Sequence, residues 1–132
     1  MAYPALVAVY DNLDHALDDL TALEILHEDR LIEGFDAAVI DHESGRPHIV
    51  KRVDRPRIRV IGEELGSGAL PRRQLEAAAR ELGPGQACLI AVGDSSLAKA
   101  FARLARATER GHCPVDTGAG EIAGAVHEAL ES

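Results

Sequence analysis

Two stretches of this chain, roughly eighty residues apart, carry the same pattern of residue types. The first is LVAVYDN at residues 6–12, and the second is LIAVGDS at residues 89–95. Leu13, Ala16, Leu17 and Leu20 follow the first copy; Leu97, Ala100, Phe101 and Leu104 follow the second, with one extra residue at Ser96. Each copy is a short apolar strand, a polar stop and then apolar residues at helical spacing. A repeated strand-then-helix unit constrains the fold more than any other feature.

The remaining elements follow from periodicity and from turn residues. Strands are predicted at residues 5–10, 35–41, 48–53, 87–92 and 112–115, with 55–61 extending the third strand or beginning another. Helices are predicted at residues 13–30, 71–82, 97–109 and 120–131. Asp11 or Asn12 is placed to cap the first helix, and Ser95 or Ser96 the third, because short polar side chains accept from free helical N–H groups.

This order contains two split β-α-β units, one from each copy of the repeat. We therefore expect an α+β fold in which residues 1–132 form a single domain. The specific expectation is a ferredoxin-like sandwich, with an antiparallel sheet, helices on one face and further helices appended. Such a sheet leaves an open face or edge, which small domains commonly cover by forming a homodimer or a higher homo-oligomer.

Composition limits the function classes. The aromatic residues are only Tyr3, Tyr10, Phe35 and Phe101, which favours close packing over large ligand cavities. Cys88 and Cys113 have no metal-ligand or redox spacing, so we expect reduced thiols and a cytoplasmic location. No window approaches the apolar run of about 18 residues that a membrane span needs, and the N-terminal residues lack signal-peptide features.

The net charge of −8 is unevenly distributed along the chain. Residues 1–45 carry eleven acids and one base, whereas residues 46–110 carry thirteen bases and seven acids. These segments can attract one another across a subunit interface, or they can form opposite solvated faces of one molecule. The overall acidity argues against nonspecific nucleic-acid or membrane binding.

Arg55, Arg57 and Arg59 lie in the densest basic stretch, next to Lys51 and Arg52. On an extended segment Arg57 and Arg59 project from the same side, where guanidinium groups can grip a phosphate or a carboxylate. They can equally pair with acidic residues of a neighbouring subunit. No aromatic residues accompany them, which disfavours single-stranded nucleic acid.

A metal site is a further candidate. His42 and His48 flank a predicted turn, with Asp41 and Glu43 nearby, and two imidazoles plus a carboxylate can hold Zn²⁺. The simpler interpretation is that both histidines are exposed beside the turn.

Three other patterns have simpler structural explanations. The G-x-G-x-x-A pattern within residues 116–123 is better explained as a flexible helix entry than as a dinucleotide site. His112-Cys113 lacks an orienting acid, which argues against a cysteine nucleophile. Asp11 and Asp94 occupy matching strand ends and can face one another, but helix capping explains both.

The first half resembles an uncharacterised bacterial family in Val9-Tyr10-Asp11, in the spaced Ala16, Leu17 and Leu20, and in the strand Phe35–Ile40 followed by Gly45. The second half is similar in Leu82–Gly85, the strand Cys88–Val92 and the segment Glu121–Leu130. Many members are described as predicted membrane proteins because a Gly-rich apolar insert follows the third strand. Here only Gly62–Gly68 occupies that place. The resemblance implies a ferredoxin-like fold and no known activity, cofactor or catalytic residues.

No catalytic constellation is evident, so we do not expect an enzyme or a cofactor. The sequence favours a non-catalytic, self-associating interaction module with a regulatory or stress-related role, with a further protein partner as an option. The alternative is a small-molecule or anion-binding domain that uses the basic strand 55–61 and the Gly-rich loop 62–68.

Overall fold

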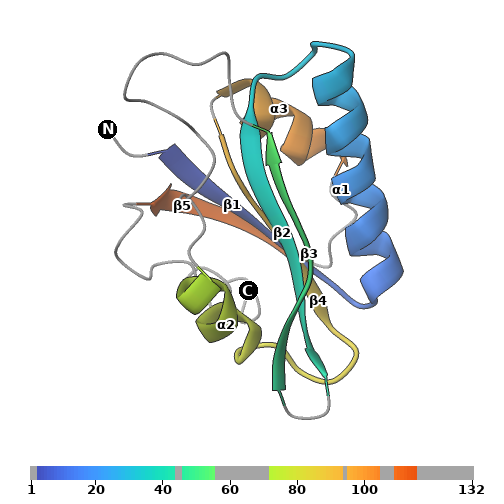
Figure 1. The fold of residues 1–132 in the computed structure, drawn as a ribbon, viewed down its shortest axis with the longest axis vertical. Helices are drawn as coiled ribbons and strands as arrows, with labels where there is room; N and C mark the ends of the chain where they lie inside the picture. Colours follow the sequence, from blue (N-terminus) through green and yellow to red (C-terminus); the bar gives the residue numbers. More distant parts are fainter. Residues whose placement is uncertain (1–2, 44–45, 56–71, 94, 105–108, 116–132) are drawn as a thin grey trace.

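Five antiparallel strands form the sheet of the computed structural model, which describes residues 3–43, 46–55, 72–93, 95–104 and 109–115 (Figure 1). Their spatial order is β3 (Arg46–Arg55), β2 (Phe35–Glu43), β4 (Ala87–Val92), β1 (Tyr3–Tyr10) and β5 (Glu109–Val115). Every neighbouring pair is antiparallel. Because β4 lies between β1 and β2 and opposes both, β1 and β2 run parallel to each other. The predicted α+β class with an antiparallel sheet is confirmed.

The three described helices cover both faces of this sheet. α1 (Leu13–Glu28) connects β1 to β2, and α3 (Ser95–Leu104) connects β4 to β5. These two helices pack against the same face and share one apolar core, whereas α2 (Arg72–Ala79) packs against β2 and β3 from the opposite face (Figure 1). α2 is therefore an appended helix. The last predicted helix, residues 120–131, lies outside the described residues.

Both faces of the central strands are buried. On the α1 side the core includes Tyr10, Phe35 and Leu89, and on the α2 side Val7 and Ile90 are fully inaccessible. All six residues of β4 are buried, as expected for an unbroken apolar run. The open sheet face expected from the sequence is therefore absent from the central strands, because side chains of both alternating sets are covered.

The ends of α1 follow from local chemistry. Asn12 is the N-cap, and its side-chain oxygen accepts a hydrogen bond from the backbone N–H of His15 at 2.9 Å. At the other end the helix stops at Glu28, two residues before the predicted end. Arg30 there adopts a left-handed backbone with φ 62°.

In the second strand-then-helix unit, α3 begins two residues before its predicted start at residue 97. Ser95 and Ser96 lie inside the first turn of α3, so they are not the residues that precede it. The hydroxyl of Ser96 instead accepts a hydrogen bond from the backbone N–H of Glu33 at 3.1 Å. This bond joins the start of α3 to the segment that follows α1. Among the described helices none is long and apolar enough to cross a membrane.

Candidate functional site

The predicted anion-binding residues lie almost entirely outside the described part of the chain. Arg55 is the last residue of β3, where its backbone is paired with Phe35, but its side chain is not among those described. Arg57, Arg59 and the loop Gly62–Gly68 also lie outside the described residues. Binding of an anion by this stretch therefore remains a prediction.

The two histidines proposed as metal ligands are not brought together. His48 is paired directly with Asp41, whereas His42 is paired with Pro47, so the two imidazoles project from opposite faces of the β2–β3 hairpin. Nδ1 of His48 donates to the Asp41 carboxylate at 3.0 Å, and Nδ1 of His42 donates to the carbonyl of Leu82 at 3.2 Å. No group of three or more metal-ligating side chains occurs among the described residues.

The remaining sequence candidates gain no support as catalytic groups. Cys88 is fully buried, and burial raises the pKa of its thiol far above the ordinary range. His112 and Cys113 belong to β5, whose side chains are not among those described, and the pattern at residues 116–123 lies outside the described chain. Asp11 follows β1 at the end of the sheet where β4 begins, because Tyr10 is paired with Ala87. Asp11 and Asp94 therefore follow strand ends that lie at opposite ends of the sheet.

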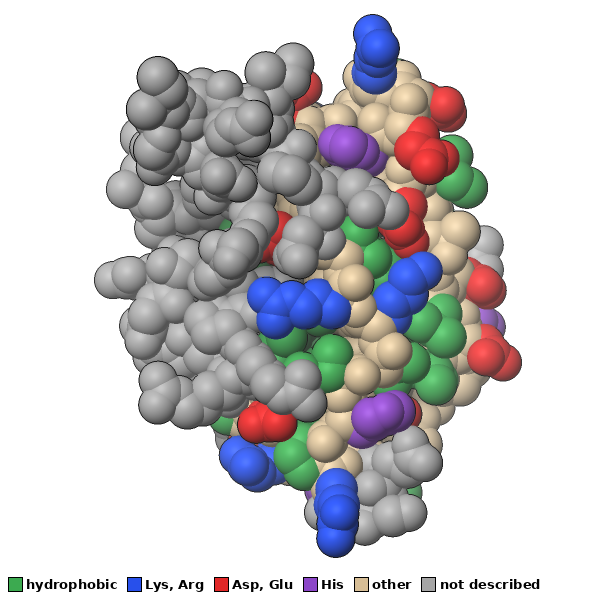
Figure 2. Space-filling view, viewed as in Figure 1, with side chains coloured by type: hydrophobic (Ala, Val, Ile, Leu, Met, Phe, Trp, Pro, Cys, Tyr) green, Lys and Arg blue, Asp and Glu red, His purple; other side chains and the backbone are tan. Residues whose placement is uncertain are grey.

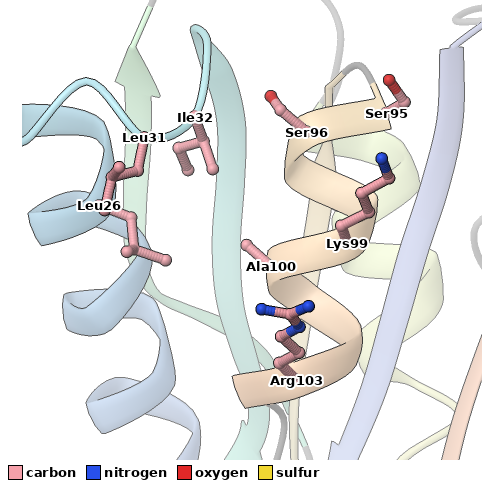
Figure 3. A pocket seen from close by; sticks show the side chains of 8 residues that line it. All are labelled: Leu26, Leu31, Ile32, Ser95, Ser96, Lys99, Ala100 and Arg103. Atoms are coloured by element: carbon pink, nitrogen blue, oxygen red, sulfur yellow. The ribbon is translucent and has the colours of Figure 1, made fainter.

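The feature that the structure adds is a cleft between α1 and α3, on the face of the sheet that both helices cover (Figure 3). Its volume is about 510 Å³, which lies within the range of small-molecule sites. Its lining residues come from the end of α1, the following turn and one side of α3: Leu26, Leu31, Ile32, Ser95, Ser96, Lys99, Ala100 and Arg103. The sparse aromatic content predicted close packing, and this hollow lies at the surface between two helices rather than inside the core.

One wall of the cleft is set by the way α1 ends. The backbone N–H of Leu31 donates to the carbonyl of Leu26 at 2.9 Å, and that of Arg30 donates to the carbonyl of His27 at 3.0 Å. These two bonds, with Arg30 left-handed, form a Schellman motif, which commonly brings the residue two positions past the cap against the last turn. The motif places Leu26 and Leu31 together as one apolar wall (Figure 3).

The other wall belongs to α3. Ser95, Lys99 and Arg103 are four residues apart in turn, so they form one line along the helix. Figure 3 shows the guanidinium of Arg103 on the side of α3 that faces α1, beside Ala100. Lys99 and Arg103 are exposed, and neither makes an ion pair with any residue in the described part of the chain. The cleft therefore has an apolar floor and a cationic side.

The sequence contains a pattern that predicts the basic side of α3, although periodicity alone does not distinguish it from other helical spacings. Lys99 and Arg103 are spaced i, i+4 on a predicted helix, which places both on one face. Which neighbour that face meets depends on the crossing of α1 and α3, and this is a tertiary property.

The acidic and basic segments of the sequence lie next to each other in the fold. On the face seen in Figure 2, acidic side chains gather over α1 and basic side chains over the adjacent β3. One pair is in direct contact, because Nζ of Lys51 donates to the Glu24 carboxylate at 3.2 Å. Part of the predicted acid–base attraction is therefore satisfied within a single chain.

Comparison of the chain with protein-family models, with curated proteins and with solved structures gives no match. The interpretation of the cleft therefore depends on its own geometry.

Proposed function

We propose that this chain is a non-catalytic interaction module that self-associates through the surface formed by α1 and α3. One observation carries the proposal. Ile25 and Leu31 are the large hydrophobic residues exposed on the described surface, at 50 % and 66 %. Ile25 lies in the last turn of α1, and Leu31 follows that helix and lines the cleft. Exposed apolar side chains next to an apolar hollow are typical of protein–protein contact sites.

The charges around this patch are complementary to those of a second copy. Glu28 and Asp29 are exposed at the end of α1, whereas Lys99 and Arg103 are exposed on α3. A twofold axis running along the cleft places α3 of each copy against α1 of the other. Each basic flank then meets an acidic flank, while the apolar centre of each patch meets that of its partner.

Association through the β3 edge is less favourable. β3 is an edge strand ten residues long, but it carries three features that protect an edge from pairing. Pro47 lacks an N–H donor, and Lys51 places an exposed charge on the strand. The third feature is a register shift, because Val39 pairs with Lys51 and Ile40 with Ile49, which leaves one extra residue in β3. With the central sheet faces also buried, the α1–α3 surface is better supported than the β3 edge.

The test is the oligomeric state measured by sedimentation velocity over a concentration series. We expect a reversible homodimer that weakens at high salt, because opposite charges at the rim are screened. Arg103→Glu should weaken the dimer. Arg80→Glu, at an exposed position after α2 on the other face, is the matched control.

Three outcomes would overturn this proposal. One is a strict monomer at high micromolar concentration in both low and high salt. Another is a dimer that Arg103→Glu and Leu31→Gln leave unchanged. The last is a dimer that Arg80→Glu weakens as much as Arg103→Glu does.

We also propose that the sheet is a ferredoxin-like sandwich with an insertion. The support is that α1 joins strands on either side of β4, and α3 joins strands on either side of β1. β3 and α2 fall between these two units, and β3 extends the sheet beyond the usual four strands. Kinship with the uncharacterised bacterial family and a cytoplasmic location are parts of the same proposal, and they depend on the sequence features given above.

A further inference from the structure

The cleft between α1 and α3 combines apolar and basic side chains. The chain carries a net charge of −8, yet both charged side chains that line the cleft are basic and no lining residue is acidic. Its deepest apolar contributor, Ile32, is buried, and Leu26 and Ala100 are half-buried. A ligand in this cleft would contact aliphatic side chains below and Lys99 and Arg103 at one side.

From this juxtaposition we propose that the cleft binds a small amphiphile with one anionic head group and one short unbranched aliphatic chain. The head group pairs with Arg103, whose guanidinium faces α1 and whose charge is not taken up by a described carboxylate (Figure 3). The aliphatic chain lies along Leu26, Ile32 and Ala100, where it loses contact with water. This function is distinct from self-association and does not depend on it.

The lining also indicates which ligands fit poorly. It contains no aromatic side chain, so a nucleobase finds no stacking surface. It contains no carboxylate, so a cationic head group finds no partner. The hydrogen bond from Glu33 N–H to the Ser96 hydroxyl engages that hydroxyl and joins the two walls at one end of the cleft, which favours a short chain over a long one.

The experiment is an NMR titration of the ¹⁵N-labelled full chain with hexanoate, octanoate and decanoate below their micellar concentrations. We expect shifts of the amides of Leu26, Leu31 and Ala100. The affinity should rise about fourfold per added methylene from hexanoate to octanoate as apolar area is buried, and less from octanoate to decanoate, because the Glu33–Ser96 bond joins the walls at one end. Octanol should bind at least tenfold more weakly than octanoate, and octyltrimethylammonium should leave these amides unshifted.

Three variants make the test specific. Arg103→Gln should lower the octanoate affinity about tenfold and leave octanol unchanged, because only the charge-assisted bond is lost. Ala100→Leu should abolish binding by filling the cleft, with an unchanged circular dichroism spectrum. Arg80→Gln is the matched control and should bind octanoate as the parent chain does.

Equal affinity for octanoate, octanol and octyltrimethylammonium would overturn the site, as would shifts confined to residues outside the cleft. The two proposals fail separately. A strictly monomeric chain that binds octanoate removes the interaction module alone, and a dimer that binds no carboxylate removes the ligand site alone. If both hold, octanoate should dissociate the dimer, because ligand and partner both use Arg103.

Discussion

The hydrogen bond between Tyr10 and Asp19 offers the sharpest test of how α1 is held on the sheet. The hydroxyl of Tyr10, at the end of β1, donates to Oδ2 of Asp19 on α1 at 2.7 Å. Both residues are buried, with exposures of 1 % and 4 %. Since α1 forms one wall of the cleft, this bond helps to set the geometry of the candidate site.

The expected cost of Tyr10→Phe follows from the character of this bond. A buried hydrogen bond to a carboxylate contributes roughly 1.5–3 kcal/mol to stability. We therefore expect a loss of about 2 kcal/mol in the free energy of unfolding, with no cavity because the ring remains.

The measurement is urea unfolding followed by circular dichroism at one fixed protein concentration, because self-association would make stability concentration-dependent. Tyr10→Phe, Asp19→Asn and the double variant form a cycle in which we expect a coupling energy of about 1 kcal/mol or more. Asp18→Asn, at the adjacent exposed position of α1, is the control and should change stability little. A coupling energy near zero, or equal effects of Asp18→Asn and Asp19→Asn, would refute the inferred tie between β1 and α1.

Three further predictions concern single positions. Arg30→Gly should raise the free energy of unfolding by about 1 kcal/mol, because glycine adopts the left-handed backbone without strain, whereas Arg30→Ala should give no such gain in the same urea assay. In a chain carrying Cys113→Ser, the Cys88 thiol should resist maleimide at neutral pH until the protein unfolds, because burial keeps its pKa high; rapid native labelling would contradict this. Gly93→Ala should destabilise by about 1–3 kcal/mol, because its Cβ would lie 2.7 Å from Cδ2 of buried Leu97; an unchanged urea midpoint would show that Leu97 moves aside.

Much of the fold could be predicted from the repeated units because both depend on short-range patterns. The two apolar runs lie side by side as β1 and β4, and the matching residues Val7 and Ile90 are paired with each other at the centre of the register. The hairpin of β2 and β3 was likewise predicted from two strand-like segments on either side of the expected turn at Ser44-Gly45. The boundaries were harder, since α1 ends through a left-handed Arg30 and not at a glycine.

The candidate site could be predicted much less well. The sequence brought His42 and His48 together because both flank one turn, but the alternation of a strand sends them to opposite faces. Of the open face or edge expected from the sequence, the central strands leave no open face, whereas β3 and β5 are edge strands. α2 packs against β2 and β3 on the side away from α1, and periodicity does not specify on which side of a sheet an inserted helix lies.

The acidic and basic segments of the sequence have different roles on the two sides of α1. Acidic α1 lies between two basic neighbours, with Lys51 of β3 on one side and the line of Lys99 and Arg103 on α3 on the other. Toward β3 the charges meet directly, and an exposed pair of this kind adds no more than about 1 kcal/mol to stability. Toward α3 the cleft keeps opposite charges apart across an apolar floor. On the β3 side of α1, opposite charges therefore pair within the chain. On the α3 side, the basic side chains remain available for a ligand or a second copy.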